Sequence, residues 1–116
     1  MNGLPTLLAE RRGEAGAELD IEVPLDNPWF EGHFPVFAIL PGVVQIGWAV
    51  HYAHTLYGLG PAIASLDQIK FRRPVSPGAR LTLHLKPDLT ARKLRYEYRD
   101  AQASYSSGVL NFGKSA

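Results

Sequence analysis

The chain has 116 residues, no cysteine and a formal net charge of +1, and it is 46% hydrophobic and 20% charged. This length predicts a single domain over residues 1–116, and the composition is that of a globular protein. The lack of cysteine excludes a disulfide scaffold, a thiolate nucleophile and a cysteine-based zinc site, and it fits a reducing compartment. The first 16 residues hold no basic segment followed by a long apolar one. We therefore expect a cytoplasmic protein without a secretory signal.

The charges are unevenly distributed along the chain. Residues 1–35 hold seven acidic side chains against two basic ones, and residues 70–99 hold nine basic side chains against two acidic ones. Residues 32–66 contain no Asp, Glu, Lys or Arg. The basic third either meets an acidic partner or forms a solvated face of a sheet, which is the more frequent explanation.

The first predicted element is a strand over residues 18–23. Its apolar side chains, Leu19, Ile21 and Val23, alternate with acidic ones, as in a half-buried strand. Residues 24–41 follow with four prolines and predict a long irregular loop. Loops of this length in a small domain are usually functional.

A helix is predicted from Gly42 to Gly58. Pro41 stands where a helix can begin, and Gly58 where one ends. The segment is apolar nearly all round, which predicts burial on most faces. A membrane span is excluded by its length, which is below about 20 residues, and by three polar side chains inside it.

The rest of the chain predicts four strands, over residues 62–71, 80–86, 92–99 and 104–112. Leu81, Leu83 and Leu85 alternate with polar residues, and so do Leu94, Tyr96 and Tyr98. Short connections predict that these last strands form an antiparallel meander. One apolar helix and about five strands predict an α+β domain in which an antiparallel sheet wraps around the helix.

A histidine in the long loop is the first candidate for chemistry. His33 precedes the predicted helix start by nine residues. Unpaired N–H groups at a helix start can hold a carbonyl oxygen that gains negative charge, and a nearby histidine can move a proton at neutral pH. Together these groups suit proton abstraction next to a carbonyl. A lone loop histidine is more often structural, so this pattern leaves both explanations open.

Three motifs carry a resemblance to a known family. They are Gly32-His33-Phe34-Pro35, Leu40-Pro41-Gly42-Val43, and Ile69-Lys70-Phe71-Arg72-Arg73-Pro74-Val75 with a following Pro77-Gly78. In their order and spacing they resemble the (3R)-hydroxyacyl-[acyl-carrier-protein] dehydratases of fatty acid biosynthesis, over roughly residues 19–112. The short chain and Trp48 are similar to the branch associated with aryl polyene and related lipid pathways.

The resemblance implies a hot-dog fold, a homodimer with two active sites at its interface, and no metal or organic cofactor. It makes His33 the catalytic base and the backbone N–H of Gly42 the donor to the thioester carbonyl. It implies substrate-binding positions at Phe34, Pro41, Val43 and Gly47. The implied partner is an acyl carrier protein with a phosphopantetheine-linked acyl substrate, which Lys70, Arg72 and Arg73 could meet.

The chain departs from this family at the helix. The family's acid, which comes from the other protomer, lies five residues after the helix-opening glycine, and that position here is Gly47. Glycine within a helix costs about 1 kcal/mol relative to alanine. Close packing would explain it, and so would room for a bulkier substrate or another catalytic group. His51 lies one turn later on the same helix face and is the best stand-in for the acid, whereas Gln45 is expected to point elsewhere.

Several alternatives remain at this stage. His51 and His54 could form a metal pair, although their spacing without a nearby acid is poor evidence. An acyl tunnel or plain packing explains the apolar side chains of the loop, which are Trp29, Phe30, Phe34, Phe37, Ile39 and Leu40. No motif for nucleic acid is present. The rival functions are a hot-dog acyl thioesterase and a catalytically impaired partner subunit that binds acyl groups or the carrier protein.

Overall fold

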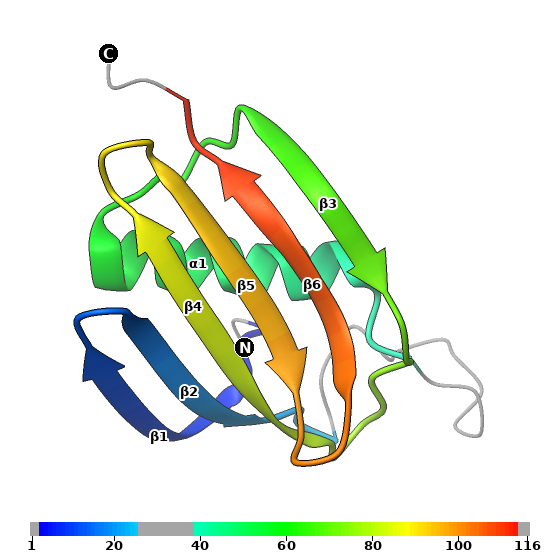
Figure 1. Cartoon of the computed structure of the whole chain (residues 1–116). Coiled ribbons are helices and arrows are strands. Elements are labelled where there is room, and N and C mark those ends of the chain that lie inside the picture. Colours follow the sequence, from blue (N-terminus) through cyan, green and yellow to red (C-terminus); the bar gives the residue numbers. More distant parts are fainter. Residues whose placement is uncertain (1–2, 26–38, 114–116) are drawn as a thin grey trace.

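The computed structural model describes residues 3–25 and 39–113, which form one helix and one six-stranded antiparallel sheet. The elements in chain order are β1 (Thr6–Gly13), β2 (Gly16–Glu22), α1 (Gly42–Tyr57), β3 (Ser65–Phe71), β4 (Arg80–Asp88), β5 (Lys93–Arg99) and β6 (Ser104–Asn111). The strand order across the sheet is β1-β2-β4-β5-β6-β3. The sheet curves around α1, which lies across one face of it (Figure 1). This arrangement confirms the predicted sheet around a central helix.

The core lies between α1 and the inner face of the sheet. The predicted inward residues of β2, β4 and β5 are all buried, because their alternation places every second side chain on the helix side. α1 contributes Val44, Gln45, Trp48, Ala49, Tyr52 and Ala53 to this core. The opposite face of α1, which includes Val43, Gly47 and His54, is exposed in the single chain. The prediction of a helix buried on most faces is therefore wrong for one protomer alone.

The predicted helix limits are confirmed. α1 begins at Gly42 and ends at Tyr57, and Gly58 terminates it in the left-handed conformation at φ 70°. Glycine suits this position because it has no Cβ to clash. The indole Nε1 of Trp48 donates to the carbonyl of Gly3 at 2.7 Å, which ties the start of the chain to the helix. No described helix is long and apolar enough to cross a membrane.

Two sequence expectations are wrong. β1 was not predicted, because all of its residues are exposed and it has no apolar alternation to indicate a strand. The meander is also shorter than expected: it comprises β4, β5 and β6, whereas β3 pairs with the far side of β6.

The segment after β3 explains this difference, since it crosses the end of the sheet instead of turning back on β3 (Figure 1). The amides of Arg72 and Arg73 donate to the carbonyl of Tyr105 on β6. Farther along, the amide of Gly78 donates to the carbonyl of Val23, which follows β2. The short connection therefore carries the chain from the edge of the sheet to its centre.

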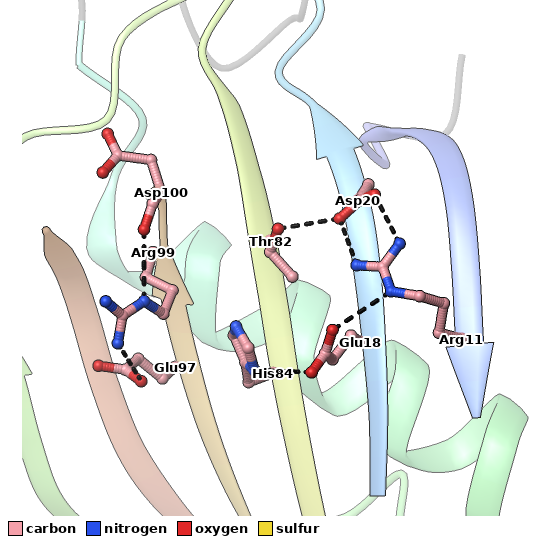
Figure 2. Close-up of polar contacts among 8 residues, drawn as sticks. All are labelled: Arg11, Glu18, Asp20, Thr82, His84, Glu97, Arg99 and Asp100. Atoms are coloured by element: carbon pink, nitrogen blue, oxygen red, sulfur yellow. Dashed lines mark hydrogen bonds and ion pairs between the residues drawn. The ribbon is translucent and has the colours of Figure 1, made fainter. Parts of the chain in front are cut away.

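The outer face of the sheet pairs acidic side chains of β2 with a basic side chain of β1. Arg11 on β1 donates to both carboxylate oxygens of Asp20 on β2, at 2.8 and 2.9 Å, and to Glu18 at 3.2 Å (Figure 2). Thr82 on β4 also donates to Asp20. The hydrogen bonds from Arg11, and then that from Thr82, lower the pKa of Asp20 from its ordinary 3.8 to about 2. The acidic strand β2 is thus neutralised in part by its two neighbours.

This network predicts a pH dependence of stability. A carboxyl whose pKa is lower in the folded state stabilises the fold above its unfolded pKa, and this contribution is lost as the pH falls towards the folded value. We expect the free energy of unfolding to decrease between about pH 4 and pH 2, and to decrease less in an Arg11→Met variant. Urea unfolding at a series of pH values measures this difference.

Arg12→Met is the matched control. Arg12 donates to the carbonyl of Leu56, and its guanidinium lies 5.4 Å from the centre of the Tyr57 ring, so the described contacts of this side chain include no carboxylate. Its loss should change stability by a similar amount at every pH in this range. Equal acid sensitivity in wild type and the Arg11 variant would contradict the assignment.

Candidate active site

The N-terminus of α1 presents free backbone donors. The carbonyl of Pro41, which caps the helix, accepts hydrogen bonds from the amides of Val44 and Gln45 at 3.0 and 3.2 Å. Within the described part of the chain, the amides of Gly42 and Val43 have no acceptor. A helix start carries a partial positive charge as well as these unpaired N–H groups. Gly42 therefore offers a donor to an oxygen that gains negative charge.

Gly42 lies in direct contact with Phe71, the last residue of β3. A Cβ added at Gly42 would lie 2.5 Å from Cζ of the Phe71 ring, which is too close for two carbon atoms. The absence of a side chain at Gly42 is therefore what lets the ring reach the helix backbone. Since Phe71 is 52% exposed, the ring has solvent on its other side.

A pocket of about 520 Å³ opens beside this contact. One wall comes from the segment that leads into α1, and the other from the end of β3 and the segment after it. The lining residues are Ile39, Leu40, Pro41, Gly42, Gln45, Phe71, Arg72, Arg73 and Pro74. The described lining is mostly apolar, and its only charged side chains are the two arginines.

Gln45 forms the floor of this pocket and is 3% exposed. Its Nε2 donates to the carbonyl of Leu40 at 3.1 Å, and its Oε1 accepts from the hydroxyl of Ser106 on β6 at 2.7 Å. Its backbone carbonyl accepts from the hydroxyl of Tyr98 on β5 at 2.7 Å. Burial raises the pKa of Tyr98 well above its ordinary value, so this phenol stays a donor at physiological pH.

The two arginines at the pocket are exposed, and neither forms an ion pair with a described carboxylate. Arg72 donates to the hydroxyls of Ser107 and Ser104 at 3.0 and 3.5 Å. Lys70 lies nearby on β3, opposite Ser107, but does not line the pocket. No ion pair among the described residues therefore neutralises the two arginines, although Arg73 interacts electrostatically with the Asp100 carboxylate.

The structure brings together some of the predicted site residues and separates others. Pro41, Gly42, Arg72 and Arg73 line the pocket, as do Ile39 and Leu40 from the apolar loop set. Val43 is 75% exposed and does not line the pocket. The proposed base His33 and the substrate-binding Phe34 lie outside the described residues, as do Trp29, Phe30 and Phe37.

Gly47 and His51 are not part of this pocket. Gly47 lies five residues after Gly42, which places it about 140° round the helix. It is exposed, and a Cβ added there would meet nothing within 4 Å, so packing against the described residues does not explain the glycine. His51 is half-buried, with its ring edge-on to Tyr52 at 5.0 Å. Among the described residues, no group of three or more metal-binding side chains exists.

Sequence reasoning missed two residues of the pocket. Phe71 stands inside the third motif, but only its charged neighbours were given a role. The helix position of Gln45 predicts only that it points away from Gly47, whereas its side chain contacts Ser106 on β6 and lines the pocket. The available signal was an amide side chain within a run of apolar core residues.

The fold identifies the structural class of the protein. The sheet with its enclosed helix is a hot-dog fold of the kind found in dehydratases. A solved structure named the dehydratase heterocomplex ApeI:P, from Xenorhabdus doucetiae, matches with a TM-score of 0.84 and 32% identity, over 95% of this chain and 98% of that one. The dehydratase domain of PpsC from Mycobacterium tuberculosis shares the fold at a TM-score of 0.68 and 16% identity, over 95% of this chain and 44% of that one.

The family model described as ApeI-like, ApeI dehydratase, matches residues 9–109, and the chain belongs to this family. It is also similar to 3-hydroxyacyl-[acyl-carrier-protein] dehydratase FabZ from two organisms. The protein from Gluconacetobacter diazotrophicus is 39% identical over 75 residues, which are 57% of this chain and 47% of that protein. The protein from Brucella ovis is 36% identical over 94 residues, which are 71% of this chain and 60% of that protein. The chain thus spans about half to three fifths of these relatives.

The contact between Gly42 and Phe71 yields a prediction about stability. Gly42→Ala should lower the free energy of unfolding by about 1–3 kcal/mol, because the added methyl group overpacks against the ring. In a Phe71→Ala background the same change should cost much less, since the ring is gone. Urea unfolding of the two single variants and the double variant measures this coupling.

Gly13→Ala controls for the change of glycine to alanine itself, because a Cβ at Gly13 meets nothing within 4 Å. This control should be close to neutral. A Gly42→Ala cost that persists unchanged without the Phe71 ring would show that the close approach is not its cause.

Proposed function

We propose that this chain is a dehydratase that acts on 3-hydroxyacyl thioesters of acyl carrier protein and releases trans-2-enoyl thioesters. The observation that carries the proposal is the apolar pocket at the start of α1. Its wall contains the Gly42 amide, which has no described acceptor, and two arginines that form no ion pair with a described carboxylate. Membership of the ApeI dehydratase family supports it. The pocket suits an acyl thioester because such a substrate joins an apolar chain to a polar carbonyl.

The reaction follows from the roles that the residues are given. His33 removes a proton from the carbon next to the carbonyl, and the electrons move towards the carbonyl oxygen. The Gly42 N–H and the helix dipole stabilise the negative charge that develops there. The bond from the β-carbon to its hydroxyl then breaks as the double bond forms. The hydroxyl leaves as water once it receives a proton.

The source of that last proton is the open question of the mechanism, because Gly47 has no side chain. The His33 imidazolium carries the abstracted proton and can return it to the leaving hydroxyl, which balances the reaction with one group. His51 of a second protomer is the other candidate. It shares its helix face with Gly47, and that face is uncovered in a single chain.

We further propose that the functional unit is a dimer. β3 is an edge strand that pairs only with β6, and it carries the exposed apolar side chains Leu66 and Phe71. The exposed face of α1 bears no charge. Such surfaces are usually covered in the assembled protein.

One alternative has a specific observation in its favour. A subunit without the helix carboxylate could bind substrate while a different hot-dog subunit supplies the acid. Gly47 favours this possibility, as does the heterocomplex named for the relative from Xenorhabdus doucetiae.

The proposal predicts the outcome of incubation with 3-hydroxyacyl carrier protein. Intact mass spectrometry should show a loss of water. His33→Ala should reduce the rate by at least the ~10²–10⁴-fold usual for a general base. Gly47→Glu should raise the rate, since it restores a carboxylate where the family has its acid and a Cβ there meets no described residue within 4 Å. His51→Ala should cause a large loss only if His51 supplies the proton.

The alternatives give different products in the same assay. Release of a free acid indicates a thioesterase, and an unchanged mass indicates a binding subunit. Sedimentation equilibrium of the same samples measures assembly, and a monomer at assay concentration contradicts a shared site. Unchanged dehydration by His33→Ala would rule out the mechanism.

Carrier-protein binding gives a separate prediction for the basic entrance. We propose that Lys70, Arg72 and Arg73 meet the acidic carrier protein or the phosphate of its phosphopantetheine arm. Reversing the charge of Arg72 and Arg73 to Glu should raise KM for a carrier-bound substrate more than for a small thioester analogue, and the difference should shrink with added salt.

The matched control reverses Lys93 and Arg95 to Glu. These side chains lie on β5, do not line the pocket, and change the net charge by the same amount. An equal rise in KM with the control pair would show steering by net charge alone. An equal effect on carrier-bound and small substrates would indicate a structural role for the two arginines.

A further inference from the structure

Gln45 and Ser106 are the only fully buried polar side chains among the described residues, apart from tyrosines. They are 3% and 0% exposed, and they bind each other through the 2.7 Å hydrogen bond from the Ser106 hydroxyl to Gln45 Oε1. Gln45 lies in the first turn of α1 and lines the candidate site, and its partner Ser106 lies on β6. A buried polar contact of the described core thus adjoins this site.

The orientation of the Gln45 amide follows from its partners. The carbonyl of Leu40 can only accept a hydrogen bond, so the nitrogen of the amide must face it. The oxygen then faces the Ser106 hydroxyl, which donates. A flipped amide would place two acceptors against each other, so this one arrangement is fixed.

Burial without such partners would destabilise the protein. An apolar side chain of similar length, such as methionine, would fill the same volume without the cost of removing an amide from water. The Gln45–Ser106 pair therefore fixes the relative position of the segments that it joins, which an apolar core would not do, because each hydrogen bond has a preferred distance and direction.

The Gln45–Ser106 pair fixes the position of the pocket wall. Leu40 stands between the lining residues Ile39 and Pro41, two positions before Gly42. Its carbonyl is held by Gln45, and its amide donates to the carbonyl of Val75 at 2.7 Å. Through Ser106 and Tyr98, Gln45 also joins the first turn of α1 to β6 and β5. The segment that ends in Gly42 is thus fastened to the centre of the sheet.

We propose that Gln45, together with Ser106, is a positioning residue that aims the Gly42 amide at the thioester carbonyl. This inference rests on the proposed function, in which that amide stabilises developing negative charge. Such stabilisation requires a donor close to its ideal place, and a misplacement of about 1 Å can cost on the order of 100-fold in rate. Neither Gln45 nor Ser106 touches the reacting atoms in this account.

The test compares variants that differ in hydrogen bonding and not in volume. Ser106→Val and Ser106→Thr have nearly the same shape, but only threonine keeps the hydroxyl. Gln45→Met keeps the length of the side chain and removes the amide. We expect Ser106→Val and Gln45→Met each to lower kcat by roughly 10–100-fold with KM changed less than threefold. Ser106→Thr should retain most of the activity.

The two residues should act as one unit. The double variant Gln45→Met/Ser106→Val should have about the same kcat as the slower of the two single variants. If the two residues acted independently, the two decreases in kcat would multiply. Leu83→Val controls for loss of stability, since Leu83 is buried on β4 and does not line the pocket. It should lower the urea midpoint and leave kcat unchanged.

A second measurement does not depend on turnover. The probe is a 3-hydroxyacyl pantetheine analogue in which NH replaces the thioester sulfur. Its α-protons are much less acidic than those of a thioester, so it binds without losing water. The ¹H–¹⁵N resonance of Gly42 should shift when this probe binds to the wild type and to Ser106→Thr. The shift should be lost or greatly reduced in Ser106→Val and Gln45→Met.

The two measurements separate failure of this inference from failure of the proposed function. If the wild type turns over and both apolar variants keep its kcat, the positioning role is wrong while the dehydratase stands. If the wild type is inactive, the dehydratase function is wrong, and the Gly42 resonance alone tests the positioning role. A shift that the wild type shows and the apolar variants lose then supports that role. A Gly42 resonance that does not respond to the probe in the wild type overturns the positioning role whatever the activity.

Discussion

The packing of α1 against the inner face of the sheet is the interaction on which the rest of the structure depends. α1 has no charged side chain, and six of its residues are buried against the strands. Apolar burial of this kind is the dominant favourable contribution to folding, at roughly 25 cal/mol per Å². It fixes the helix under the sheet, but it is non-directional, because apolar contacts tolerate small sliding and rotation. A site that uses the start of this helix therefore needs contacts that specify position more finely.

Two kinds of contact provide that specification. The hydrogen bonds of Gln45 with Ser106, Leu40 and Tyr98 connect the first helical turn to both the sheet and the loop before the helix. The ring of Phe71 lies close enough to Gly42 to exclude a side chain there. Hydrogen bonds and a close steric contact thus both act on the first turn of α1, where the Gly42 and Val43 amides have no described acceptor. Since Phe71 also ends β3, the edge of the sheet and the helix start meet at one place.

The sequence predicts the fold better than it predicts the site. The local sequence pattern is sufficient to predict β4 and α1. In β4, apolar Leu81, Leu83 and Leu85 alternate with polar residues, and α1 is bounded by a proline and a glycine. β1 could not be found this way, because a strand exposed on both sides shows no alternation. The position of β3 beside β6 depends on hydrogen bonds between segments distant in sequence, and no local pattern records them.

The same distinction applies to the site. Pro41 and Gly42 were found because a helix start has its own sequence signals, and their motif matches a known family. The role of Ser106 could not be found, since its importance lies in a contact with a residue 61 positions away. The contact between Gly42 and Phe71 could not be predicted either, because the sequence does not show which side chain lies against a glycine.

Gly47 carries the argument about mechanism one step further. Its position is open in the single chain, so the missing carboxylate is not the consequence of crowding by the described residues. A glycine that packs against none of the described residues lowers helix stability by about 1 kcal/mol relative to alanine, with no compensating contact among those residues. Any compensating contact must therefore come from outside them. Under the proposed function, a second hot-dog subunit that covered this face of α1 would be a source of the group that protonates the leaving hydroxyl.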